Sequence, residues 1–141
     1  MRDIAHLGTR MHALVYRVTG GRVLGRMGGE PVLLLETVGR RSGRSRTTPL
    51  QYLPHEDGFV VVASARGAPR PPAWFLNLSA RPHARVRAGR RELEVRARET
   101  VGPERQALWD ELTAANRWLE RAAGKAEREL PVVVLEPTPT G

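Results

Sequence analysis

The strongest constraint on this chain is a series of short strand-forming segments, most of them joined by links of hairpin length. From residue 31 onward, apolar runs and alternating segments recur between turns rich in Gly and Pro. Residues 91–100 are the clearest case, because Leu93, Val95 and Ala97 alternate with charged side chains. Strands linked this closely pair antiparallel, since a parallel connection needs about a dozen residues or more. Pro49 is expected to break or bulge the strand that contains it. Strands are predicted at 32–35, 46–53, 59–63, 84–88, 91–100 and 132–135.

Three other segments favour helices. Apolar residues repeat at helical spacing over 3–18 and over 103–122, and 73–80 is predicted to form a short helix. About six strands and three helices indicate an α+β fold with a small, mostly antiparallel sheet. Periodicity does not decide whether that sheet is open or closed into a barrel. A single domain is expected over 1–141, with a helix and Gly-rich connector at 1–30, the sheet domain at 31–137 and a tail at 138–141.

Positive charge is concentrated in the middle of the chain. The net charge is +8, yet the segment from Arg40 to Arg91 holds 11 arginines, no lysine and two acidic residues, a balance of +9. The remaining residues therefore carry a net charge of −1. A GC-rich genome would explain arginine in place of lysine, but not the scarcity of acidic residues in the same segment. Charge focused in this way favours an anionic partner.

Several kinds of site have no counterpart in the sequence. There is no cysteine, which excludes disulfides and thiolate chemistry. No GxGxxG, Walker or GxSxG motif occurs. His6, His12, His55 and His83 lack metal-ligand spacing, so no metal site is expected. No apolar run reaches the roughly 20 residues of a membrane span, and no signal peptide is evident, so a cytoplasmic protein is expected.

The most distinctive segment is a basic loop between two predicted strands. It runs from Val38 to Pro49 and reads VGRRSGRSRTTP. Its glycines allow a sharp turn and the close approach of a ligand to the backbone. Its arginines offer forked donors that suit phosphate and carboxylate groups. On this segment alone, a solvated basic hairpin is the alternative interpretation.

In this loop and the blocks that follow it, the chain resembles the deazaflavin (F420)-dependent nitroreductases, a family of split-barrel oxidoreductases. The resemblance rests on TVGRRSGRSRTTPLQYL at 37–53, GFVVVASARGAPRPPAWFLNLSARPHARVR at 58–87 and PVVVLEP at 131–137. These blocks occur in the order and spacing of the family, and together they cover most of 31–137. The resemblance implies a small, mostly antiparallel split β-barrel. It also implies coenzyme F420, whose phosphate and polyglutamate tail suit a basic segment with few acidic residues.

The resemblance also implies where the coenzyme binds. The basic loop would hold the phosphate and the tail, the strand after it would border the deazaflavin ring, and the segment after the third strand would close the other side. Trp74 and Asn77 would line the pocket, although each has a structural alternative, as a core residue or a brace for the short helix. The implied coenzyme residues are Arg40, Arg41, Ser42, Arg44, Arg46, Thr48, Pro49, Leu50, Ser64, Arg66, Gly67, Trp74 and Asn77.

The acceptor side departs from the family's nitroimidazole-activating members. There, the helix before the last strand and the loop preceding it carry several tyrosines, whereas the stretch from Asn116 to Lys125 has none. Asn116, Trp118, Leu119 and Ala122 are expected to take their place. A flat, apolar acceptor such as a quinone fits that surface better than a nitroimidazole does; an enone or another nitroaromatic is also considered.

The reaction implied is an F420H2-dependent hydride transfer, in which the coenzyme carries the chemistry and the protein supplies binding and orientation. A hydrogen-bond donor near the acceptor would stabilise developing negative charge, and Ser64 and Tyr52 are the candidates. Three alternatives stay open: a non-catalytic F420 carrier, an FMN- or haem-binding relative with the same barrel, and a nucleic-acid binder, which the low aromatic content of 5% argues against.

Two expectations concern the surroundings of the protein. The basic amphipathic helix at 3–18 suits peripheral contact with the inner face of the cell membrane, where quinones reside, although such a helix also packs on barrels. The oligomeric state is expected to be monomer or homodimer.

Overall fold

The computed structural model describes residues 26–27 and 30–139. Their elements follow one another as β1 (Arg26–Met27), β2 (Glu30–Val38), β3 (Ser45–Gln51), β4 (Leu53–His55), β5 (Gly58–Val62), a short 3₁₀ turn (Ala65–Gly67), α2 (Ala73–Ala80), β6 (His83–Ala88), β7 (Arg91–Glu99), α3 (Gly102–Ala115), α4 (Trp118–Ala126) and β8 (Val132–Pro137). The predicted helix at 3–18 lies outside the described residues, as do residues 140–141 of the predicted tail.

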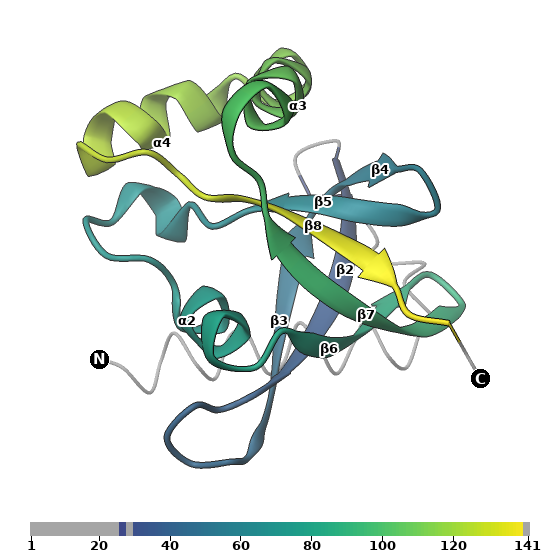
Figure 1. The fold of residues 1–141 in the computed structure, drawn as a ribbon. Coiled ribbons are helices and arrows are strands. Elements are labelled where there is room, and N and C mark those ends of the chain that lie inside the picture. The colour runs from purple at the N-terminus through teal and green to yellow at the C-terminus, as the bar shows by residue number, and fades with distance from the viewer. Residues whose placement is uncertain (1–25, 28–29, 140–141) are drawn as a thin grey trace.

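All strand pairs recorded among these residues are antiparallel, as predicted from the hairpin-length links. The strand order is β1-β2-β6-β7-β8-β5-β4, with β3 also paired to β2. Apart from the short β1, the sheet therefore begins with β3 and ends with β4, and only Tyr52 separates these two strands in sequence. Because one continuous segment forms both edges, the sheet has to curl round until they meet. The result is the α+β split barrel that the sequence led us to expect (Figure 1).

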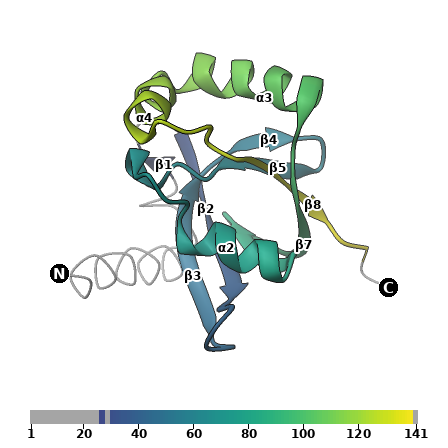
Figure 2. The same ribbon diagram turned by 60° about the vertical axis from the view of Figure 1, so that its left-hand side comes forward.

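Alternation along the strands creates two apolar layers. Leu33, Leu35, Val61 and Leu135 belong to the cluster inside the barrel. The intervening residues of β5 and β8 belong to a second cluster on the opposite face, where α3 and α4 pack over them (Figure 2). β5 is apolar throughout because both of its faces are buried.

The structure corrects three details of the strand predictions. The second predicted strand continues through Pro49, which lies opposite Leu34, and is interrupted at Tyr52 instead. Proline is tolerated there because the only strand paired with β3 in the described part of the chain is β2, so the missing N–H faces away from a ladder. β1 lies within the predicted connector, and the strand at 53–55 is additional. The predicted tail is anchored at its start, where Thr138 donates a main-chain hydrogen bond to Glu94 O (2.9 Å).

The long helix predicted at 103–122 is two helices. The first begins at Gly102, with Pro103 in its first turn, but α3 ends at Ala115 and α4 begins at Trp118. Asn116 lies between them with extended backbone (φ −143°), and its side-chain oxygen accepts a hydrogen bond from Trp118 N (3.2 Å). Asparagine favours helix ends because its side chain can satisfy an open main-chain N–H group. The apolar spacing continues across this corner, which is why periodicity alone predicted one helix.

Candidate functional site

The loop between β2 and β3 is closed by its own main chain. Gly39 N donates to Arg44 O (2.8 Å), and Gly43 N donates to Gly39 O (2.8 Å). Gly43 has a φ of +70°, and a Cβ atom on Gly39 would lie 2.6 Å from the Ser42 hydroxyl oxygen. That hydroxyl accepts a hydrogen bond from Arg44 N (3.1 Å). Both glycines and Ser42 are therefore used to shape the loop.

Asn77 of α2 braces this loop from behind. Its amide oxygen accepts hydrogen bonds from Arg40 N (3.1 Å) and from Arg40 Nη1 (3.2 Å), while its Nδ2 donates to Thr37 Oγ1 (3.2 Å). Asn77 is 4% exposed and Thr37 2% exposed. The predicted site residues Arg40 and Asn77 are thus brought together, but they bind each other. Asn77 is placed to position the loop, and Arg40 is partly committed to that contact.

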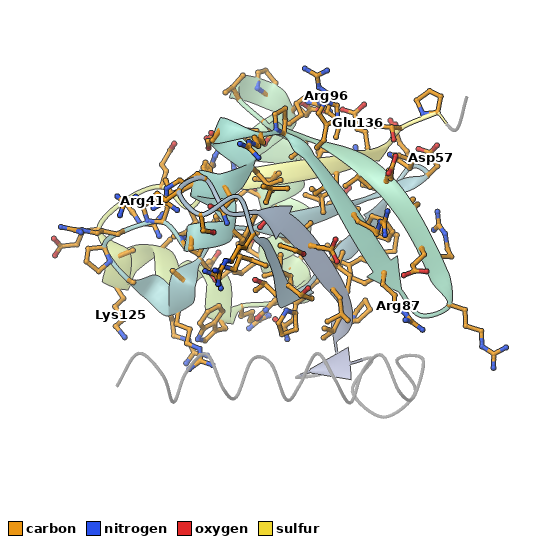
Figure 3. All side chains as sticks on the ribbon, turned by 90° about the horizontal axis from the view of Figure 1, so that it is seen from below. Arg41, Asp57, Arg87, Arg96, Lys125 and Glu136 are labelled. Carbon is orange, nitrogen blue, oxygen red and sulfur yellow. The ribbon has the colours of Figure 1, made fainter. Side chains whose placement is uncertain are left out.

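The next three arginines, two in the loop and one at the start of β3, extend into solvent. Arg41, Arg44 and Arg46 are exposed, and within the described residues none of them forms an ion pair. Figure 3 places Arg41 at the opposite end of the molecule from Asp57. Three unneutralised guanidinium groups on a braced loop form a site that suits phosphate or carboxylate groups.

The strand that follows the loop presents alternate side chains to the barrel. Thr48 lies opposite Leu35, and Leu50 lies opposite Leu33, so both side chains share the face of the barrel interior. Pro49 lies between them and is directed to the other face. The structure therefore places Thr48 and Leu50 on the inner wall, and Pro49, which was predicted with them to border the deazaflavin ring, on the opposite face of the strand.

A second predicted segment, Ser64 to Gly67, forms a tight left-handed turn. Ala65, Arg66 and Gly67 have φ values of 46°, 56° and 79°, and Gly67 N donates to Ser64 O (2.8 Å). Non-glycine residues adopt such angles at a cost, and they gather at functional sites. A right-handed residue followed by a left-handed one turns successive N–H groups toward one side, an arrangement that binds anions. Arg66 is exposed beside it.

This turn packs directly on α4. A Cβ atom on Gly67 would lie 3.1 Å from Ala122 O and 3.1 Å from Cδ of Lys125. Figure 3 places Lys125 at the same end of the molecule as Arg41. The structure thus brings Gly67, predicted to bind coenzyme, against Ala122, predicted to bind the acceptor.

A further residue that holds this segment, Arg128, was not predicted from the sequence. Its Nε donates to Ala68 O (3.1 Å), and its Nη2 lies within hydrogen-bond distance of Arg70 O (3.3 Å) and Ala63 O (3.5 Å). These contacts go to main-chain oxygens about 60 residues away in sequence. They therefore depend on no side-chain motif from which they could have been predicted.

Two predicted site residues lie in or beside the barrel core. Trp74 is 6% exposed and belongs to the interior cluster. Tyr52 is half-buried at the junction of β3 and β4, with its ring edge-on to Phe59 at 5.1 Å between centroids. Trp74 therefore takes the core alternative considered for it, and Tyr52 stands at the rim of that core.

The residues predicted for the acceptor divide into two groups. Trp118 is 38% exposed, and the half-buried Asn116 donates a hydrogen bond from Nδ2 to Gln51 Oε1 (3.3 Å) at the end of β3. Leu119 of α4 is 6% exposed and packs against α3 and the sheet, and Ala122 is 3% exposed. The last two are core residues in this arrangement, so only Trp118 and Asn116 remain accessible to an acceptor.

None of the ion pairs recorded among the described residues involves an arginine of these loops. Arg98 Nη1 binds Glu104 Oε1 (2.6 Å) and its Nε binds Glu136 Oε1 (2.5 Å), which joins β7 to α3 and β8. The hydrogen bond from Arg98 holds the pKa of the Glu104 carboxyl below its usual value, and the hydrogen bonds to Glu104 and Glu136 raise the pKa of Arg98. This network joins strands and a helix of the fold, and its carboxylates do not pair with the loop arginines.

A shallow hollow of about 250 Å³ lies on the outer face of the sheet rather than at the loops. It holds two arginines and two glutamates, so it lacks the positive excess that an anion needs. Its lining residues are Leu34, Glu36, Thr47, Arg85, Arg87 and Glu92. Among the residues that the structure describes, no cluster of three or more His, Asp or Glu side chains is placed to hold a metal ion.

Several known proteins are similar to this chain in sequence and in fold. An F420H(2)-dependent quinone reductase of Mycobacterium tuberculosis is 36% identical over 138 residues, covering 92% of each chain. A solved F420-H2 dependent reductase superposes with a TM-score of 0.69 at 33% identity, covering 75% of this chain and 94% of that one. Another structure, described as a domain-swapped dimer, has a TM-score of 0.70 at 30% identity, covering 88% and 98%. The F420H(2)-dependent quinone reductase family model matches residues 8–137, and this chain belongs to that family.

Proposed function

We propose that this protein is an oxidoreductase that binds coenzyme F420 and transfers a hydride from its reduced form to a small electron-poor acceptor of the quinone type. The observation that carries the proposal is the braced β2–β3 loop with the start of β3, where Arg41, Arg44 and Arg46 form no ion pair among the described residues. Family membership supports the same coenzyme.

The residues present fit the chemistry of this coenzyme. Its phosphate and carboxylates need several cationic donors and a backbone that a ligand can approach closely. The β2–β3 loop supplies the guanidinium groups, and Gly43 leaves open space where a Cβ atom would stand. The left-handed turn from Ser64 to Gly67 supplies main-chain donors on the same side of the barrel as α2 (Figures 1 and 2).

The chain's residues bind and orient, and the coenzyme when bound supplies the hydride. Thr48 and Leu50 border the ring from the inner wall, while Trp118 offers a flat apolar surface to the acceptor. Ser64 and Tyr52 are the proposed donors toward the acceptor oxygen as it gains negative charge. From α2, Trp74 packs in the interior cluster behind this wall, and Asn77 braces the β2–β3 loop through Arg40.

Coenzyme binding is tested by titrating the protein with F420 and following deazaflavin fluorescence, alongside FMN and haem followed by absorbance. The proposal expects saturable binding of F420 alone. Turnover is tested by the oxidation of reduced F420 with and without a menaquinone analogue. Binding without quinone-dependent oxidation would favour the carrier alternative, and preferred binding of FMN or haem would contradict the proposed coenzyme.

Two further proposals concern the acceptor that the protein prefers and its location in the cell. Quinone reduction should exceed nitroimidazole reduction under matched conditions, because the stretch at 116–125 lacks tyrosine hydroxyls. No helix among the described residues has the length and apolar character needed to cross a bilayer. A cytoplasmic protein that touches the membrane through residues 3–18 is the proposed location, and co-sedimentation with anionic vesicles tests it.

A further inference from the structure

Arg128 connects the end of α4 to a loop that precedes it by about 60 residues. Its guanidinium reaches three main-chain oxygens of that loop: Ala63 O, Ala68 O and Arg70 O. These acceptors flank the left-handed turn on both sides. One half-buried side chain therefore spans the whole segment from 63 to 70, hereafter the clamped loop.

The clamped loop needs such a contact because its backbone is strained and one side of it is tightly packed. Ala65 and Arg66 both have positive φ, which L-residues rarely adopt. Gly67 already touches α4, where even a methyl group would meet Ala122 O at 3.1 Å. The packing of Gly67 prevents the loop from moving toward α4, and the hydrogen bonds from Arg128 limit its movement away from the end of that helix.

Arg128 also keeps its charge available. Its recorded partners are carbonyl oxygens, including Glu129 O (3.4 Å), and within the described residues it forms no ion pair with a carboxylate. Carbonyl oxygens satisfy the N–H groups without neutralising the cation. A positive charge therefore lies beside the segment that contains the left-handed turn, whose N–H groups can receive an anion.

We propose that Arg128 is a positioning residue for the anionic coenzyme: it holds the clamped loop in its left-handed conformation and adds a positive charge behind it. This inference rests on the proposed function. It differs from the direct role expected of Arg66, because Arg128 acts through main-chain atoms of the loop.

Two substitutions separate the two contributions. Arg128→Lys keeps the charge but cannot reach three oxygens with a planar fork, whereas Arg128→Leu removes both the charge and the clamp. Arg121→Leu is the matched control, because it removes an exposed arginine from neighbouring α4 that has no hydrogen bond recorded in the described part of the chain.

The first measurement does not depend on coenzyme. Limited trypsin digestion, followed by mass spectrometry, reports cleavage after Arg66, an exposed residue of the clamped loop. Cleavage should be about tenfold faster in both Arg128 variants than in the wild type and in Arg121→Leu, because a released loop opens more often. Equal cleavage rates in all four proteins would overturn the clamp. If Arg128→Leu does not fold, Arg128→Lys still gives the answer.

The second measurement uses F420 titration and steady-state kinetics. Both Arg128 variants should bind F420 roughly tenfold more weakly, as expected when charged hydrogen bonds at a ligand wall are lost, and the coenzyme KM should rise more than kcat falls. Arg128→Lys should keep the wild-type salt dependence, whereas Arg128→Leu should reduce it. Wild-type affinity in both variants would overturn the inference, while a wild type that binds no F420 would instead contradict the proposed function.

Discussion

Arg41 and Arg44 extend from a loop whose shape is fixed by glycines, Ser42 and Asn77. Replacing either arginine with alanine should weaken F420 binding by about 1–3 kcal/mol, the range for hydrogen bonds to charged groups. The melting temperature should hardly change, since exposed side chains without ion pairs contribute little to folding. Fluorescence titration and thermal melts measure the two effects. Arg96→Ala on β7 is the control, and a large stability loss with unchanged affinity would give the loop arginines a structural role.

At this scale the sequence predicted the identity of the cationic side chains but not how they are supported. The spacing of Gly39, Gly43 and the arginines indicated a shaped anion loop. The contact of Asn77 with Arg40 could not be predicted from spacing, because it joins residues 37 positions apart. Arg128 was missed for the same reason. Arg98, one of the charged residues that alternate with the apolar ones in β7, is part of an ion-pair network and would not serve as a neutral control.

α4 presents one exposed aromatic residue to a prospective acceptor. Trp118→Ala should raise the KM for a menaquinone analogue several-fold, corresponding to about 1 kcal/mol for a lost aromatic contact, and leave F420 affinity unchanged. Steady-state kinetics with each substrate varied in turn measures both. Leu119→Ala is the contrasting variant. Truncating that core side chain should lower the free energy of unfolding by roughly 2–4 kcal/mol. An unchanged quinone KM in Trp118→Ala would place the acceptor elsewhere.

The ion-pair network at the junction of β7, α3 and β8 predicts that the stability of the protein depends on pH. The pKa of Glu104 in the folded protein is lowered mainly by its hydrogen bond from Arg98. The ionised carboxylate therefore stabilises the fold at pH values above the pKa it has in the unfolded chain. This stabilisation is lost as the pH falls through the lower pKa of the folded protein. The melting temperature of Glu104→Gln should therefore fall less than that of the wild type between about pH 6 and pH 3. Glu111→Gln, on the same helix without an ion pair in the described chain, should behave like the wild type.

Elements were predicted well where the local pattern and the tertiary environment agree. The β6–β7 hairpin and α2 match their predicted ranges closely, and β5 was recognised from its apolar run. The predicted helix and strand boundaries were wrong where tertiary contacts with distant parts of the chain decide the local structure. Asn116 divides a continuous apolar stripe through its contacts with Trp118 and Gln51. Pro49 stays in a strand because the sheet places that strand at an edge.

For the molecule as a whole, the excess charge should govern coenzyme binding. The segment from Arg40 to Arg91 carries +9, so F420 affinity should fall as NaCl rises from about 0.05 to 0.5 M, because screening weakens attraction to exposed charges. Fluorescence titration across that series measures it. The KM for an uncharged quinone should not change across the same series. Equal F420 affinity at both ends would contradict an electrostatic site, and tight DNA binding at physiological salt would revive the nucleic-acid alternative.

The position of β8 has a consequence for how the molecule is made. This strand is the last of the described elements in sequence, yet it lies between β7 and β5 in the sheet. A nascent chain emerging from the ribosome carries β5 and β7 with open edges until residues 132–137 arrive. Strand pairings so distant in sequence form slowly, and open edges invite association with other chains. Folding of this sheet should therefore complete in one late, cooperative step once residues 132–137 are available, and chaperones that shield exposed strands should raise its yield.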